Sequence, residues 1–160
     1  MKAIIAGSFN PFTLGHKDIV TRVASMFDEV VVAVADDTYK KTAPLSVRTE
    51  IAKLSLSDVK GVRVLPFSGL LTDFAKKTGA EVIVRGLRNT VDFEYEKSLG
   101  EAYKSLSGIE TLFLMCSPEL SHVSSSLVRS LAELNAPMDG YVAVGAQSAV
   151  KAAYAKKDKE

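Results

Sequence analysis

Short apolar runs rich in β-branched residues alternate with helical patterns along almost the whole chain, and this alternation limits the fold more than any other feature. Five runs are predicted strands: Lys2–Ala6, Glu29–Ala35, Val62–Pro66, Glu81–Arg85 and Glu110–Met115. Because each run is nearly continuous in apolar character, it suits a parallel sheet covered by helices on both faces. The pattern therefore predicts an α/β fold with a doubly wound, parallel five-stranded sheet.

Apolar residues spaced three and four positions apart predict helices between these runs. The expected helices cover residues 16–27, a segment around 51–56 capped by Ser46, a segment from 70 that ends near Gly79, residues 92–106, a segment that starts at 124–126, and residues 142–155. Residues 156–160 are expected to form a solvated tail. We expect a single domain, with its core over 1–134 and a C-terminal helix and tail over 135–160.

The charge balance and the cysteine content exclude several classes of protein. The chain has 160 residues with 20 Lys and Arg against 19 Asp and Glu, so no broad nucleic-acid-binding or membrane-binding surface is expected. Its single cysteine, Cys116, ends an apolar run and is expected to pack in the core, which fits a reducing compartment. No apolar run is long enough for a signal peptide or a membrane span. The sequence therefore predicts a soluble, cytoplasmic protein.

The segment Gly7–His16 follows the first predicted strand and has the features of a phosphate-binding turn. Gly7 and Gly15 allow a tight turn and close approach of the backbone to a ligand, and Pro11 stiffens the turn. Free N–H groups and the positive dipole end of the next helix suit a phosphate. His16 can add a hydrogen-bond donor or a charge at the same place. The alternative is a glycine-rich turn that binds nothing, with His16 as a helix cap.

A second segment with anion-binding chemistry follows the fourth predicted strand. Arg85 and Arg88 flank Gly86, and two planar guanidinium groups at a strand end favour phosphate. The alternative is a solvated network of ion pairs with the acidic residues that follow, Asp92, Glu94 and Glu96. The position of the two arginines at the same edge of the sheet as Gly7–His16 favours phosphate binding.

The loop after the fifth predicted strand leads into a helix through three consecutive serines. Ser124, Ser125 and Ser126 offer hydroxyl groups and free N–H groups to an anion or a nucleotide, although capping by Ser124 alone would explain them. His122 has no second histidine or cysteine nearby at ligand spacing. It is therefore expected to be a loop residue rather than a metal ligand.

The loop after the second predicted strand carries Lys40 and Lys41, whose mobile ammonium groups can reach a transferred phosphate. Asp36 and Asp37 precede them, and solvation or capping is expected for both rather than metal binding. The chain has no Walker A motif, no GxGxxG fingerprint and no zinc-ligand spacing. These absences argue against a P-loop kinase and a dehydrogenase.

Three segments carry a family resemblance when they are taken together. They are GSFNP…TLGH over residues 7–16, RGLR…DFEYE over residues 85–96, and VSSSLVR over residues 123–129. The first matches the (T/H)xGH signature of the nucleotidylyltransferase superfamily, and the second is far more specific. From Met1 to about Leu134 the chain resembles the bacterial phosphopantetheine adenylyltransferase family.

The resemblance implies a Rossmann-like fold and a group-transfer reaction. Enzymes of this family transfer the AMP group of ATP to 4′-phosphopantetheine, which gives dephospho-coenzyme A and pyrophosphate, with Mg²⁺ as cofactor. The resemblance also implies a homohexamer and feedback by coenzyme A.

The resemblance further implies roles for residues at matching positions. His16 would stabilise the transition state at the α-phosphate, and Lys40 would bind substrate phosphate and neutralise developing charge. Ser8 would contact both substrates, Arg85 would bind the phosphate of phosphopantetheine, and Leu71 would line the pantetheine arm. The implied ATP-binding residues are Ser8, Phe9, His16, Gly86, Leu87, Arg88, Glu96, Leu120, Ser121, His122, Val123, Ser124, Ser125 and Ser126. No protein ligand for a metal is implied.

The chain departs from the family pattern at three positions. Asn10 stands where the family usually has Asp, Ala6 replaces a proline, and Gly69 falls where some members carry Asp. Two other functions stay open. A nicotinate mononucleotide adenylyltransferase would share the first segment, although the 85–96 block argues against it, and a nucleotide-sensing module would bind without turnover.

Overall fold

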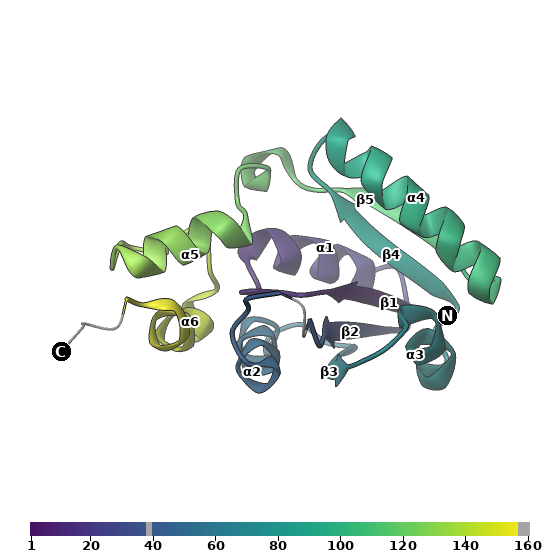
Figure 1. Ribbon diagram of the computed structural model, residues 1–160, viewed down its shortest axis with the longest axis horizontal. Helices are drawn as coiled ribbons and strands as arrows, with labels where there is room; N and C mark the ends of the chain where they lie inside the picture. The colour runs from purple at the N-terminus through teal and green to yellow at the C-terminus, as the bar shows by residue number, and fades with distance from the viewer. Residues whose placement is uncertain (38–39, 157–160) are drawn as a thin grey trace.

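A computed structural model describes residues 1–37 and 40–156 of the chain. Within this part, five parallel strands form one sheet in the order β3-β2-β1-β4-β5 (Figure 1). The strands are β1 (Lys2–Gly7), β2 (Glu29–Ala35), β3 (Val62–Phe67), β4 (Val82–Leu87) and β5 (Glu110–Met115). This strand order belongs to a doubly wound, Rossmann-like sheet, so the predicted fold class is confirmed.

Helices connect the strands and cover both faces of the sheet. The α-helices are α1 (Leu14–Ala24), α2 (Leu45–Ser55), α3 (Leu71–Thr78), α4 (Thr90–Ser107), α5 (Ser125–Glu133) and α6 (Gln147–Tyr154), with short 3₁₀ helices η1 (Pro118–Leu120) and η2 (Val144–Ala146). Helices α5 and α6 lie side by side, at the end of the molecule away from the N-terminus (Figure 1). No helix in the described ranges is both long and apolar enough to span a membrane.

The alternation of side chains along each strand builds two separate cores. On one face, Ala3 and Ile5 of β1 pack in a cluster that includes buried residues of α1, α2, α5 and α6. On the other face, Ile4 and Ala6 pack with Leu71 of α3 and with other residues of the second cluster. Since both faces are covered, the strands are apolar on both sides, as the sequence predicts.

The order of the strands places a crevice at the carboxyl ends of β1 and β4. These two strands are neighbours, and the helix after β1, α1, covers one face of the sheet. The helix after β4, α4, packs on the other face through Tyr103. Chain segments that leave neighbouring strands toward opposite faces diverge, and ligands of doubly wound sheets bind in the resulting crevice.

Several predicted boundaries differ from the structure. β4 extends through Gly86 and Leu87 because both residues pair with β5, whereas the sequence predicts that the strand ends at Arg85. Helix α1 begins at Leu14 rather than His16, since Thr13 is its N-cap. Ser46 is not a cap: it lies inside α2, whose N-cap is Pro44.

The C-terminal helix is shorter than the predicted range 142–155. Residues 144–146 form the 3₁₀ helix η2, and α6 begins only at Gln147. Of the predicted tail, residues 157–160 lie outside the described part of the chain. Gly79, by contrast, ends α3 in the left-handed conformation (φ 73°), as predicted for a helix stop.

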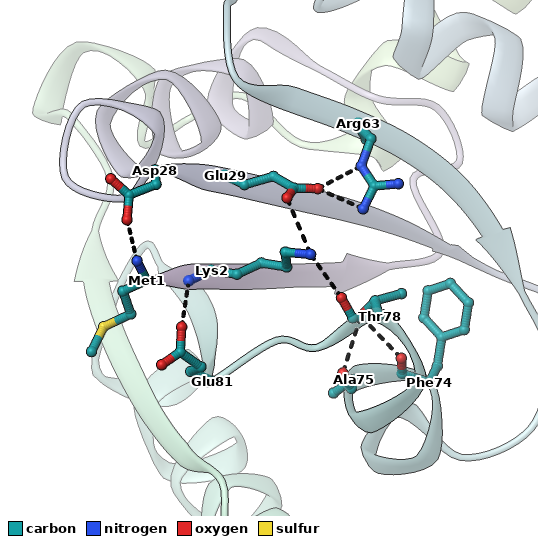
Figure 2. Close-up of polar contacts among 9 residues, drawn as sticks. All are labelled: Met1, Lys2, Asp28, Glu29, Arg63, Phe74, Ala75, Thr78 and Glu81. Atoms are coloured by element: carbon teal, nitrogen blue, oxygen red, sulfur yellow. Dashed lines mark hydrogen bonds and ion pairs between the residues drawn. The ribbon is translucent and has the colours of Figure 1, made fainter.

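Ion pairs close the opposite edge of the sheet, where the strands begin (Figure 2). The Lys2 ammonium lies 3.1 Å from Glu29 and donates to the Thr78 carbonyl at 2.9 Å, while Glu29 also pairs with Arg63 at 2.5 Å. The backbone N–H of Lys2 donates to Glu81 at 2.9 Å. This network joins β1, β2 and β3 to the turn before β4. The charged groups at this edge therefore have a structural role, and the predicted site residues gather at the other edge.

Candidate active site

A cavity of about 580 Å³ lies at the carboxyl ends of β1 and β4. Its walls come from the loop after β1, the first turns of α1 and α5, the end of β4 and the loop after β2. Most of the residues predicted to bind substrates line it: Ser8, Phe9, His16, Lys40, Arg85, Gly86, Leu87, Arg88, Glu96, Leu120, Val123, Ser124, Ser125 and Ser126. The fold thus brings together segments that are more than 100 residues apart in the sequence.

Three predicted site residues lie outside this cavity. Leu71 is buried in the core beneath the sheet, in the cluster that contains Ala75. The Ser121 hydroxyl donates to the Pro118 carbonyl at 2.9 Å, and the His122 ring packs edge-on against another aromatic ring. Their contacts with substrate stay predictions.

His16 is held in one orientation by its own helix cap. The backbone N–H of Thr13 donates to His16 Nδ1 at 3.0 Å, and the Thr13 hydroxyl accepts from the backbone N–H of His16. Because a backbone N–H can only donate, Nδ1 must be unprotonated, and the neutral ring carries its proton on Nε2. The site therefore holds a neutral imidazole with an N–H donor available for a ligand.

Packing and nearby charge keep this imidazole neutral. The rings of Phe9 and Phe12 lie 5.0 and 5.2 Å from the His16 ring, centroid to centroid. Burial, followed by the positive charges of Arg88 and Arg85, lowers the pKa of His16 to about 4. Gly7 makes this packing possible, since a Cβ there would lie 3.2 Å from the Phe9 ring. His16 is thus suited to donate a hydrogen bond without carrying a full charge.

The low pKa of His16 predicts a pH dependence of stability. Unfolded chains bind a proton on histidine near pH 6.5, but the native state does so only near pH 4. The free energy of unfolding should therefore fall as pH drops from 6.5 to 4, by up to about 1.4 kcal/mol per pH unit from this group. Urea unfolding at pH 7.5 and pH 5 measures the loss. We expect His16→Gln to lose about 2 kcal/mol less than the unmodified chain over this interval; equal losses would contradict the assignment.

Two helix N-termini face the cavity and favour anions there. Gly15 and His16 come from the first turn of α1, and Ser125 and Ser126 from the first turn of α5. The Ser124 hydroxyl caps α5 by accepting from the Leu127 N–H at 3.0 Å, so the predicted capping role is confirmed. The remaining first-turn N–H groups and both helix dipoles suit bound phosphates.

The two arginines at the end of β4, Arg85 and Arg88, form ion pairs. Arg85 forms a two-pronged pair with Glu96 at 2.6 and 2.8 Å and also donates to the Ala6 carbonyl at 2.5 Å. Arg88 pairs with Asp92 at 3.2 Å. Both arginines thus pair with acidic residues named in the sequence alternative, but the Arg85–Glu96 pair is mostly buried rather than solvated. All four side chains also line the cavity. A phosphate that binds Arg85 must compete with Glu96.

Asp37 connects two of the predicted substrate-binding residues. Its carboxylate accepts a short hydrogen bond from the Ser8 hydroxyl and lies 3.8 Å from the Lys40 ammonium. The expectation of solvation or capping is thus wrong for Asp37, because the fold brings the loops after β1 and β2 together. Asp36 is exposed, as expected.

Asn10 and Arg129 hold the loop after β1, a role that the sequence does not predict for either residue. Arg129 lines the cavity and donates to the Asn10 carbonyl at 2.8 Å. The Asn10 side-chain oxygen accepts from the Ala43 N–H at 3.1 Å and from the Tyr154 hydroxyl at 2.6 Å. The sequence held one signal for Arg129: it lies one helical turn after Ser125 and shares its face of α5.

The Tyr154 contact predicts that α6 supports the site. Burial raises the pKa of Tyr154 to about 12, so its hydroxyl stays protonated and donates to Asn10. Tyr154→Phe should lower the free energy of unfolding by about 1 kcal/mol, which corresponds to a melting temperature lower by about 2–4 °C. Thermal unfolding measures this shift. No change in melting temperature would mean that the hydrogen bond contributes nothing to stability.

No cluster of three or more His, Cys, Asp or Glu side chains suited to a metal occurs in residues 1–37 and 40–156. The carboxylates of Asp92 and Glu96 line the cavity but pair with arginines. Mg²⁺ needs only one or two carboxylates when substrate phosphates and water supply its other ligands. The cavity is therefore compatible with a metal ion that enters bound to phosphates.

Cys116 is partly buried and packs against the hydrophobic core, in which the sequence predicts it. It also lines the cavity.

Sequence comparisons with known proteins identify the family of this chain. A family model described as cytidylyltransferase-like matches residues 4–131. A phosphopantetheine adenylyltransferase from Moorella thermoacetica is 48% identical over 142 residues, 88% of this chain and 89% of the relative. One from Staphylococcus carnosus is 41% identical over 97% of this chain and 98% of its own length. The chain belongs to the phosphopantetheine adenylyltransferase family. This confirms the resemblance drawn from the motifs and identifies the chain as a nucleotidyltransferase.

A solved structure supports the same fold. A protein from Vibrio parahaemolyticus, provisionally described as a nicotinate-nucleotide adenylyltransferase, superposes with a TM-score of 0.71 at 14% sequence identity, over 98% of each chain. At this identity the likeness concerns the fold alone. The phosphopantetheine adenylyltransferase family is therefore assigned from the sequence relatives, and the fold agrees with it.

Proposed function

We propose that this protein transfers the AMP group of ATP to 4′-phosphopantetheine and releases dephospho-coenzyme A and pyrophosphate. The observation that carries this proposal is the cavity between β1 and β4. There a neutral His16 donor, two helix N-termini and the side chains of Lys40, Arg85 and Arg88 converge. Family membership supports the choice of substrates.

The chemistry of this transfer requires positioning rather than a strong base. An oxygen of the phosphopantetheine phosphate attacks the α-phosphorus of ATP, and the bond from that phosphorus to the α,β-bridging oxygen breaks. The attacking oxygen is already anionic, and pyrophosphate leaves with the electron pair. The difficulty is to bring two polyanions into line and to stabilise charge on the α-phosphoryl group. A cavity with many N–H donors and cationic side chains meets both needs.

The structure supports specific roles for the residues of this cavity. His16 donates from Nε2 to the α-phosphoryl oxygen, because Nδ1 is occupied by the Thr13 N–H. Lys40 lies on the loop after β2 with its side chain 69% exposed, so it can move onto a phosphate. Arg85 binds the phosphate of phosphopantetheine once Glu96 is displaced.

We expect ATP to bind between β4 and the first turn of α5, with Mg²⁺ bound to its phosphates. Gly86, Leu87 and Arg88 lie on one side of this region and Ser124–Ser126 on the other. The metal ion supplies charge neutralisation for the pyrophosphate when it is bound.

Pyrophosphate release tests the proposal with two acceptors in parallel. The protein is given ATP and Mg²⁺ with either 4′-phosphopantetheine or nicotinate mononucleotide. Release with phosphopantetheine alone is the expected result. Release with the mononucleotide alone would replace the proposed acceptor, and ATP binding without release in either case would favour a nucleotide sensor.

We further propose that the protein assembles as a homohexamer in the cytoplasm and responds to coenzyme A. The family resemblance suggests the assembly and the feedback. A group of exposed apolar side chains on α4 and β5, Val91, Tyr95, Leu106, Leu112 and Met115, supports burial in an interface between subunits. Light scattering of the purified protein measures the assembly, and a monomer at micromolar concentration would overturn it.

A further inference from the structure

Arg48 is a buried cation at the edge of the site that the family resemblance does not explain. It lies on α2, is 1% exposed and is the largest of the fully buried side chains. Its Nε donates to the Ala43 carbonyl at 2.8 Å, and one terminal nitrogen donates to the Ser8 carbonyl at 2.6 Å and the Ala35 carbonyl at 2.8 Å. A buried guanidinium is usually paired with a carboxylate. No ion pair of this kind involves Arg48 in the described part of the chain.

The three carbonyl groups belong to three different segments of the site. Ser8 follows β1, Ala35 is the last residue of β2, and Ala43 lies between Lys40 and α2. Ser8 and Lys40 both line the cavity. The Arg48 side chain therefore joins the backbone segments that carry Ser8 and Lys40.

A second hydrogen bond also fixes Ala43 to the loop after β1. The N–H of Ala43 donates to the Asn10 side chain at 3.1 Å, while its carbonyl accepts from Arg48. Ala43 is thus fixed to the loop after β1 both through Asn10 and, by way of Arg48, through Ser8. The end of the Lys40 loop cannot move relative to Ser8 without breaking these bonds.

We propose that Arg48 is a positioning residue for the transfer reaction, which holds Ser8 and Lys40 in a fixed relation at the cavity. This inference rests on the proposed function. The planar guanidinium is needed because its nitrogens donate in fixed, divergent directions, whereas a lysine ammonium is a single point on a flexible stem. A displacement of about 1 Å in such a site can cost a hundredfold in rate.

Arg48→Lys distinguishes a positioning role from the role of a buried positive charge. The variant keeps the charge but loses the fixed directions of the guanidinium hydrogen bonds. Its matched control is Arg63→Lys, at the exposed ion pair with Glu29 on the opposite edge of the sheet (Figure 2). We expect Arg48→Lys to lower kcat about tenfold to a hundredfold, with the KM of each substrate changed less than threefold. Arg63→Lys should leave kcat and the KM values unchanged.

Amide hydrogen exchange gives a readout that does not depend on turnover. In Arg48→Lys the Ala43 amide should exchange at least about tenfold faster than in the unmodified chain, while core amides of β1 keep their protection. A purely structural role would instead lower the melting temperature and leave kcat of the folded fraction unchanged, which would overturn the proposal.

The remaining outcomes are equally decisive. If Arg48→Lys is too unstable at 25 °C, the same measurements at 10 °C and on Arg48→Gln replace it. Failure of both variants to fold would assign Arg48 to fold stability and reject the positioning role. If the unmodified chain shows no turnover, the proposed function fails. Turnover in the unmodified chain with equal kcat in Arg48→Lys rejects only this inference.

Discussion

Replacement of His16 by alanine is expected to lower kcat about a hundredfold to a thousandfold, the usual effect of removing one hydrogen-bond donor to developing charge. The KM of ATP should change much less, because the helix N-termini and Arg88 remain in place. Steady-state kinetics with both substrates measures the two effects separately.

His16→Gln is the matched variant, since its side-chain amide keeps an N–H donor while losing the imidazole ring. We expect it to recover part of the rate lost in His16→Ala. Thermal unfolding of both variants controls for the lost helix cap, which involves the His16 ring and Thr13. A kcat within threefold of the unmodified enzyme in His16→Ala would remove this residue from the mechanism.

Arg85→Gln is expected to raise the KM of phosphopantetheine about tenfold to a hundredfold, because hydrogen bonds to a charged group contribute about 1.5–3 kcal/mol each. The ATP KM should change less than threefold. The variant should also be less stable, since Glu96 is only 12% exposed and loses its ionic partner.

Glu96→Gln removes the negative partner of the same ion pair and therefore controls for that loss of stability. Both variants disrupt the Arg85–Glu96 pair, but only Arg85→Gln removes the proposed phosphate ligand. We expect Glu96→Gln to keep a low KM for phosphopantetheine and to raise that of ATP. Equal phosphopantetheine KM values in the two variants would show that Arg85 is structural alone.

The sequence predicts the centre of the sheet well because β1 and β2 are buried on both faces, whereas the edge strands β3 and β5 are partly exposed. The apolar runs that begin at Lys2 and Glu29 start where β1 and β2 start, since no exposed residue interrupts their interiors. The predicted end of β4 at Arg85 is wrong, because pairing with a neighbouring strand extends β4 beyond the residues that favour a strand. Gly86 has low strand propensity, yet its pairing with Leu114 of β5 keeps it in the sheet.

The sequence predicts those parts of the site that lie in loops directly after a predicted strand. Gly7–His16, Arg85–Arg88 and Ser124–Ser126 converge because the carboxyl ends of parallel strands share one edge. The contacts of Asp37, Asn10 and Arg48 could not be predicted, because each bridges loops whose relative position depends on the whole fold. In the sequence, Arg48 looks like any charged residue of an amphipathic helix.

The fate of the α-phosphate tests the central claim most directly. The protein is incubated with Mg²⁺, 4′-phosphopantetheine and ATP labelled at the α-phosphate, and the products are separated. We expect the label in dephospho-coenzyme A and none in ADP, since the bond between the α-phosphorus and the bridging oxygen breaks. Label that stays in ATP, or appears in ADP or free AMP without dephospho-coenzyme A, would contradict transfer of AMP to phosphopantetheine.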